Sequence, residues 1–264
     1  MSSTPSPQAP LLVERRGATV HLCFNRPHAL NAVDVPMAHA LLEAMRTLTS
    51  DTTVRAVVLR GAGKGFMAGG DLATLRADPV QGATDLLGPL NEALELMAAL
   101  NAPVIAQVHG VAAGAGLSLM LQADFVLAAQ GTHFNLAYIN LGTSCDVGAS
   151  WALPRLVGMR KALEIALLGD TLTCGDAERL GLINRVVPLD QIDAEVSLLA
   201  DRLASGPTLA YGAMKRLLRT SFENDLPAQL AHEAAAFGQC ARSHDFRIGI
   251  ESFYGKCSAQ FNGS

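Results

Sequence analysis

HGVAAGAGLSLMLQAD, at residues 109–124, is the segment from which the rest of this chain is best interpreted. The five residues before it, 104–108, form a short apolar run that is typical of a buried strand. Three glycines and three alanines then precede Leu117, Leu119 and Leu121, which begin an apolar, helix-like pattern. We therefore expect a strand, a turn without bulky side chains and a buried helix, in that order.

A turn of this kind presents free backbone N–H groups at a helix start, and its lack of side chains lets a ligand approach the main chain. Alternatively, the small residues only allow the helix to pack closely. A second segment, GAGKGFMAGGDL at residues 61–72, also follows a predicted strand (54–59) and also contains small residues. Neither segment has the spacing of a Walker loop or of a dinucleotide fingerprint. The two turns could instead each offer one N–H to a shared oxygen, as an enolate or oxyanion requires.

Composition limits the class of protein. Half of the 264 residues are hydrophobic and 17% are charged, so a large core is available. The net charge of −4 and the lack of a basic run argue against nucleic acid as a partner. No apolar run approaches the roughly 20 residues of a membrane span. Five scattered cysteines without a CxxC motif predict reduced thiols and a cytoplasmic location, and the histidine spacing predicts no metal site.

The order of predicted elements indicates an α/β fold. Residues 11–15 and 19–24 alternate in polarity and predict a hairpin, and Asp34 is expected to cap the helix that follows. Strands then alternate with helices as far as a last strand at 183–187, after which the pattern is helical. We predict a flexible tail at residues 1–10, an α/β core at 11–200 and a helical region at 201–264 that contributes to trimerisation or to a lid.

Several motifs in the same order resemble those of the crotonase superfamily, whose enoyl-CoA hydratases and isomerases act on acyl-CoA thioesters. They are NRPHALNA at residues 25–32, GFMAGGDL at 65–72, the segment 110–124, and 169–188 with its AERLGLIN. The resemblance implies a crotonase-like ββα spiral core with a C-terminal helical region. It also implies a homotrimer or a dimer of trimers, and a substrate that carries CoA without any further cofactor.

Position by position, the resemblance implies that the backbone N–H groups of Ala68 and Ala115 form the oxyanion hole. Other positions are implied to bind CoA or substrate: His28, Ala29, Leu30, Gly70, Asp71, Leu72, Gly114, Tyr138, Phe253 and Lys256. Phe253 and Lys256 match residues that sometimes reach the site from a neighbouring subunit. For Lys256 a solvated surface charge is the alternative, and for Asp71 a role in orienting its turn or capping a helix.

The departures from the family pattern indicate the reaction. Hydratases of the family carry two glutamates at positions that are Ser118 and Tyr138 here, so both water-activating carboxylates are lost. One acid remains, Asp146, in a segment that resembles the epoxyphenylacetyl-CoA isomerase branch. The resemblance implies a single acid/base and hence an enoyl-CoA isomerase, which shifts a double bond from β,γ to α,β. The alternative role for Asp146 is the N-cap of a helix at 149–157.

Other roles remain open at this stage. An aspartate at the position of Asp146 also serves aryl-CoA dehalogenases, but their partner histidine falls near Asn91 here. A non-catalytic acyl-CoA-binding scaffold is the alternative from another class. Cys145 has no histidine near it in sequence and is expected to line a pocket or the core, as are Tyr138 and Trp151.

Overall fold

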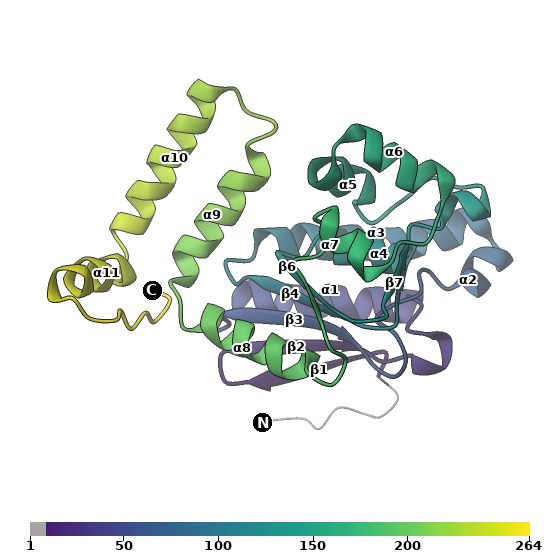
Figure 1. Cartoon of the computed structure of the whole chain (residues 1–264), viewed down its shortest axis with the longest axis horizontal. Helices are drawn as coiled ribbons and strands as arrows, with labels where there is room; N and C mark the ends of the chain where they lie inside the picture. The colour runs from purple at the N-terminus through teal and green to yellow at the C-terminus, as the bar shows by residue number, and fades with distance from the viewer. Residues whose placement is uncertain (1–8) are drawn as a thin grey trace.

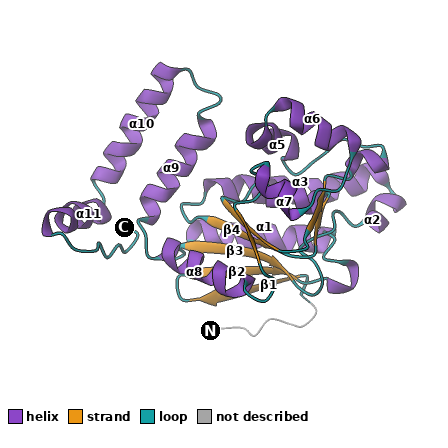
Figure 2. Ribbon diagram, viewed as in Figure 1, coloured by secondary structure: helices purple, strands orange, loops and turns teal. Residues whose placement is uncertain are grey.

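The structure, a computed structural model, describes residues 9–264, with the side chain of Ala77 left out. Its centre is a six-stranded sheet in the order β1-β2-β3-β4-β6-β8, in which β1 is antiparallel to β2 and all later neighbours are parallel (Figures 1 and 2). These strands are β1 (Leu11–Arg16), β2 (Thr19–Phe24), β3 (Ala56–Gly61), β4 (Val104–Val108), β6 (Phe125–Ala129) and β8 (Arg185–Val187). Two short strands, β5 (Val111–Ala113) and β7 (His133–Asn135), form a second, parallel sheet.

Helices connect and cover the strands (Figure 1). Those of the first half are η1 (Pro27–Ala29), α1 (Val35–Ser50), α2 (Leu72–Ala77), α3 (Pro79–Ala99) and α4 (Ala115–Met120). Those of the second half are η2 (Tyr138–Leu141), α5 (Ala149–Val157), α6 (Met159–Leu168), α7 (Cys174–Arg179), α8 (Ile192–Ala204), α9 (Thr208–Thr220), α10 (Leu226–Ala241) and α11 (His244–Gly255). The α/β class expected from the sequence is confirmed.

Both faces of the large sheet are buried, because alternate residues of each strand point to opposite sides. On one face Leu22 and Leu59 belong to the main apolar cluster, which includes Met45 of α1. On the other face Val58 and Ile105 pack with residues of α8, from Ile192 to Leu203. The sheet is therefore a rigid base from whose strand ends the site is built.

Sequence patterns locate most elements, with small shifts. The hairpin of β1 and β2 is confirmed, and so is the Asp34 cap, whose side chain accepts a hydrogen bond from the N–H of Met37 at 2.9 Å. Strand β3 begins at Ala56 and not at Val54, because the N–H of Val54 donates to the carbonyl of Asp51 in a turn. The segment 134–148, expected to be irregular, contains the end of β7 and the short helix η2.

The segment 109–124 differs from expectation in one respect. Residues 111–113, predicted to lie in a turn, form strand β5, because they pair with β7 and because Ala112 makes a further bridge to Met67. The turn is reduced to Gly114, and helix α4 begins at Ala115 instead of Leu117. Strand β5 thus brings the start of α4 beside the turn that follows β3.

The C-terminal helices project from the core. In Figure 1, α9 and α10 form a hairpin that stands to one side of the sheets, and α11 follows at the lower end of α10, at the left edge of the view. The boundary predicted after residue 200 falls inside α8, whose Leu203 still packs on the sheet. Most of the predicted tail lies outside the described residues, although the carbonyls of Ala9 and Pro10 accept hydrogen bonds from Asn25. Among the described helices, none has the length and hydrophobicity needed to cross a membrane.

Candidate active site

Two turns made of small residues meet beside the second sheet. One follows β3 and holds Ala68, Gly69 and Gly70, and the other is Gly114 at the start of α4. The N–H of Ala113 donates to the carbonyl of Met67 at 3.0 Å and ties the two together. A Cβ atom on Gly116 would lie 2.2 Å from that same carbonyl oxygen. Close packing of α4 therefore requires glycine there, so the packing explanation holds for Gly116.

Three backbone N–H groups at these turns have no acceptor within residues 9–264: those of Gly69, Gly70 and Ala115. Ala115 is the first residue of α4, where N–H groups lack a partner inside the helix. Gly70 forms a parallel bridge with Val33, in which the flanking groups, the carbonyl of Gly69 and the N–H of Asp71, take both hydrogen bonds at 2.8 Å. The N–H of Gly70 therefore faces away from that bridge.

The prediction that Ala68 supplies an oxyanion donor is wrong. Its N–H already donates to the carbonyl oxygen of Leu30, at 3.0 Å. The free N–H groups of this turn are those of Gly69 and Gly70, and the sequence analysis assigned Gly70 only to CoA binding. The sequence identifies a turn with free N–H groups but not which of its residues carry them, because the pairing of the turn with the distant segment 30–33 decides this.

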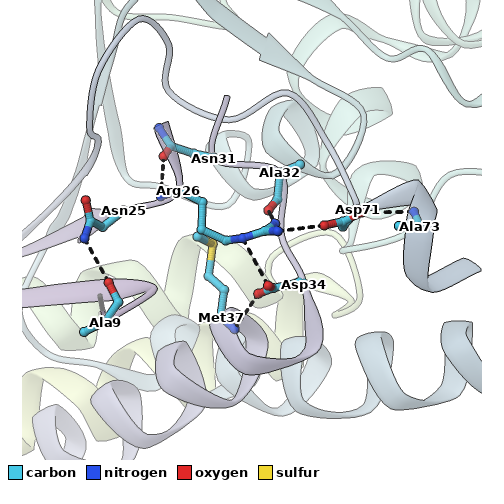
Figure 3. A network of polar contacts seen from close by, with 9 residues as sticks. All are labelled: Ala9, Asn25, Arg26, Asn31, Ala32, Asp34, Met37, Asp71 and Ala73. Atoms are coloured by element: carbon cyan, nitrogen blue, oxygen red, sulfur yellow. Dashed lines mark hydrogen bonds and ion pairs between the residues drawn. The ribbon is translucent and has the colours of Figure 1, made fainter. Parts of the chain in front are cut away.

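The side chain of Arg26 links the loop after β2 to the turn that carries Gly70 (Figure 3). Its guanidinium group forms ion pairs with Asp34 at 3.0 Å and with Asp71 at 2.8 Å, and it donates to the carbonyl of Ala32. The hydrogen bond from Arg26 lowers the pKa of Asp71, which also accepts from the N–H of Ala73 and caps α2. Sequence reasoning missed Arg26; the orienting and capping role expected for Asp71 is confirmed.

The implied CoA positions fall into two groups. His28, Ala29 and Leu30 lie on and after η1, beside the turn that Arg26 fastens, and Leu72 lines the cavity described below. Phe253 and Lys256 do not lie near them in this chain: Phe253 is 79% exposed on α11, and Lys256 is the C-cap of that helix. In Figure 1, α11 and α2 lie at opposite edges of the molecule. A role for these two residues in binding CoA requires a neighbouring subunit.

A cavity of about 730 Å³ opens beside the free N–H groups of the two turns. Its wall of α2 and α3 is mainly apolar, and the opposite wall is the segment from Ala137 to Val147. Gly70, Ala115, Tyr138 and Asp146 all line this one cavity. The structure thus brings together the predicted acid and the predicted second oxyanion turn.

Among the residues that the structure describes, Asp146 is the only carboxylate that lines the cavity. Burial raises the pKa of Asp146, and a hydrogen bond from the hydroxyl of Tyr138 partly opposes that rise. The N-cap position of α5 is Gly148, and no side chain caps that helix. The alternative role of Asp146 as a helix cap is therefore wrong, and its carboxyl group is available for chemistry.

Ser118 and Tyr138, at the two positions where glutamates were looked for, contact each other. Their oxygen atoms lie 2.9 Å apart, and the tyrosine hydroxyl donates in turn to Asp146. Burial and the nearby Asp146 raise the pKa of Tyr138, so its hydroxyl stays protonated. The three side chains form one hydrogen-bonded cluster, in which Asp146 is the acid.

The remaining candidates do not add a second acid or base. Cys145 lines the cavity, but no histidine of the described segment does, and Asn91 is an exposed residue of α3 outside the lining. Trp151 packs elsewhere, with the guanidinium group of Arg155 4.2 Å from its ring centre. In the described part of the chain, no group of three or more His, Cys, Asp or Glu side chains is placed to hold a metal ion.

Known proteins share both the sequence and the fold. The family model for enoyl-CoA hydratase/isomerase matches residues 14–264. The 1,2-epoxyphenylacetyl-CoA isomerase of Escherichia coli K12 is 38% identical over 246 residues, which cover 92% of this chain and 94% of that protein. Crotonyl-CoA hydratase of Syntrophomonas wolfei is 30% identical, covering 95% and 97%. The crystal structure of an enoyl-CoA hydratase from Mycobacterium smegmatis has a TM-score of 0.89 at 34% identity, covering 95% and 98%.

With free N–H groups from two turns beside a cavity and a crotonase fold, the molecule is an enzyme of the class that processes acyl-CoA thioesters. The chain belongs to the enoyl-CoA hydratase/isomerase family. Its relatives include both a hydratase and an isomerase, so the choice between these reactions depends on the residues of the site.

Proposed function

We propose that this protein is an enoyl-CoA isomerase that moves a double bond from the β,γ to the α,β position. The observation that carries the proposal is the presence of one carboxylate, Asp146, in a cavity that is also lined by two residues with free N–H groups, Gly70 and Ala115. The thioester oxygen would accept hydrogen bonds from both N–H groups, which stabilise the negative charge that develops on it.

One acid/base group is sufficient for this reaction. Asp146 takes a proton from the α carbon, and the electron pair of the broken C–H bond moves into the conjugated enolate. Protonation of the γ carbon by the same carboxyl group then completes the shift, so no proton is gained or lost overall. CoA is part of the substrate, and no cofactor is consumed.

Hydration is disfavoured by the same set of residues. Adding water to a double bond uses one group to deprotonate the water and another to protonate carbon. Ser118 and Tyr138 offer hydroxyl groups in place of two carboxylates, and the raised pKa of Tyr138 keeps it from acting as a base near neutral pH.

The acyl group is expected to be apolar. Five leucines of α2 and α3 face the cavity, whereas Arg76 is the only cationic side chain that residues 9–264 contribute to its lining. The leucines are Leu72, Leu75, Leu86, Leu87 and Leu90. A hydrocarbon chain or an uncharged ring would bury apolar surface against this wall, which favours binding by about 25 cal/mol for each Å².

Two substrates test the proposal. With a 3-enoyl-CoA, isomerisation forms a conjugated thioester and the ultraviolet absorbance rises. With crotonyl-CoA, hydration would lower the absorbance, and we expect no change. Hydration of crotonyl-CoA without isomerisation would contradict the proposal. Tight binding of CoA esters without turnover would instead support the non-catalytic scaffold. The dehalogenase alternative predicts halide release from 4-chlorobenzoyl-CoA, and the absence of histidine from the cavity lining speaks against it.

A further inference from the structure

Tyr138 begins η2 and Asp146 lies in the loop before α5, and unusual backbone conformations accompany their contact. Ala137, just before Tyr138, has φ of 57°, and Val147, just after Asp146, has φ of 52°. Left-handed backbone is costly for residues other than glycine, above all for a β-branched one such as valine. Such conformations persist only where the surroundings enforce them, and they gather at functional sites. Here they flank both members of one hydrogen-bonded pair.

Several contacts stabilise the conformation of the loop that carries Asp146. The side chain of Gln122, at the end of α4, donates to the carbonyl of Gly148 at 3.1 Å. The N–H of Ala149 donates to the carbonyl of Asp146 at 3.1 Å, and the side chain of Val147 is buried in the core. The backbone on both sides of Asp146 is therefore fixed, but these contacts leave its carboxyl group free to rotate.

The hydroxyl protons decide which group donates and which accepts in each side-chain contact. A carboxylate only accepts hydrogen bonds, so the proton of Tyr138 is committed to Asp146. The oxygen of Tyr138 can then accept from Ser118, which is fully buried and lies 2.9 Å away. The single hydroxyl proton of Ser118 has two acceptors within reach, the oxygen of Tyr138 and the carbonyl of Gly114 at 3.2 Å. When it points to Tyr138, the nearer of the two, a chain of donors runs from Ser118 through Tyr138 to Oδ1 of Asp146. Among the described residues, no other side chain donates a hydrogen bond to that carboxyl group.

We propose that Tyr138 is a positioning residue, whose hydrogen bond to Oδ1 of Asp146 leaves Oδ2 to exchange the proton with substrate. Ser118 contacts the hydroxyl of Tyr138 and fixes its position in turn. The proposal rests on the proposed isomerase function. Because the tyrosine can donate to Oδ1 whether Oδ2 is charged or protonated, the carboxyl group keeps one orientation as the proton leaves the α carbon and returns at the γ carbon.

The same contact sets how readily Asp146 ionises. Burial favours the protonated acid, and the hydrogen bond from Tyr138 favours the carboxylate. Other titratable groups in the cavity lining are Cys145, on the same loop, and Arg76, on α2 across the cavity. No ion pair links either of them to Asp146 among the described residues. Tyr138 is therefore the main partner that keeps Asp146 ionised enough to act as a base.

Tyr138→Phe removes the hydroxyl and keeps the ring. A hydrogen bond to a charged group has a free energy that corresponds to about one to two pH units, so the pKa of Asp146 should rise by about that amount. The readout is the ¹³C chemical shift of the Asp146 carboxyl carbon followed against pH, with Asp146→Asn used to assign the resonance. In turnover, the acidic limb of the kcat profile should move to higher pH by the same amount, while KM changes little.

Two further variants make the test specific. Ser118→Ala should shift the same resonance in the same direction by a smaller amount, and it serves as the test if Tyr138→Phe does not fold. Tyr211→Phe, at a tyrosine outside this cavity, should leave the pKa of Asp146 and the rate profile unchanged.

The outcomes separate this inference from the proposed function. An unchanged Asp146 titration in a folded Tyr138→Phe protein would overturn the positioning role, even if Asp146→Asn is inactive and the isomerase assignment stands. Full isomerase activity in Asp146→Asn would overturn the assignment of Asp146 as acid/base and, with it, the positioning role. A shifted titration together with an inactive Asp146→Asn enzyme would support both.

Discussion

At the scale of single residues, the sequence predicts the acid of the site, Asp146, but only part of its surroundings. The loss of two glutamates at Ser118 and Tyr138 and the survival of Asp146 could be recognised in the sequence. The contact between Tyr138 and Asp146 could not, because it depends on left-handed backbone at Ala137 and Val147, residues that rarely adopt it. For the same reason the helix-cap role of Asp146 was a reasonable expectation that geometry overturns.

The raised pKa of Asp146 predicts a pH-dependent cost to folding. The folded protein holds this proton more tightly than the unfolded chain, so the free energy of unfolding should fall as pH rises from about the ordinary value of 3.8. The loss is complete once pH exceeds the raised pKa of the folded state. Asp146→Asn removes this term, so its stability relative to the native protein should improve with rising pH, as urea unfolding at several pH values would reveal.

A stability difference between the two proteins that moves in the opposite direction would mean that the pKa of Asp146 is lowered on folding. Asparagine can still accept the hydrogen bond from Tyr138, so the comparison changes the charge and little else.

At the scale of elements, the sequence predicts the two glycine-rich turns but not the segments with which they pair. Both were expected from strands that run into small residues, and both are present at the site. Strand β5 was missed because three residues are too few for a periodic pattern and because its pairing with β7 is not local. The wrong choice of Ala68 has the same origin, since its N–H is taken by Leu30 in another part of the chain.

Ala115→Pro tests the donor on α4. Proline is well tolerated at the first position of a helix, where its missing N–H has no partner inside the helix. The helix should therefore form, while the hydrogen bond to the thioester oxygen is lost. We expect turnover to fall by about 10²–10³, the usual effect of removing one oxyanion donor.

Ala115→Gly is the matched control for this variant, because it alters the side chain and retains the N–H; it should remain active. Near-native turnover by a folded Ala115→Pro protein, measured with a 3-enoyl-CoA, would show that Ala115 is not a donor.

At the scale of the whole molecule, helices α9 to α11 form an arm that exposes apolar side chains. No residue of α10 is buried, although the helix carries Leu226, Leu230 and Phe237 on its surface. Apolar residues exposed in this number indicate a surface that another molecule covers. The sequence predicted the helices of the arm from their periodicity, but nothing local to the sequence specifies how the arm is directed relative to the sheets.

We expect the arm to be covered by further copies of the chain, in a homotrimer or a dimer of trimers. Static light scattering at micromolar concentration should give about three or six times the chain mass of 27.7 kDa. Assembly would also offer Phe253 and Lys256 a neighbouring site. A mass equal to that of a single chain would contradict this expectation and would leave those two residues without a CoA to contact.

In the proposed mechanism Asp146 alone moves the proton, and Asp146→Asn tests this role without changing the shape of the side chain. The substitution preserves shape and the hydrogen bond from Tyr138 but removes the ability to take up a proton. With a 3-enoyl-CoA as substrate, we predict that the isomerase rate falls by about 10²–10⁴, while the affinity for CoA and the fold are retained. An Asp146→Asn protein that isomerises this substrate at the native rate would contradict the account.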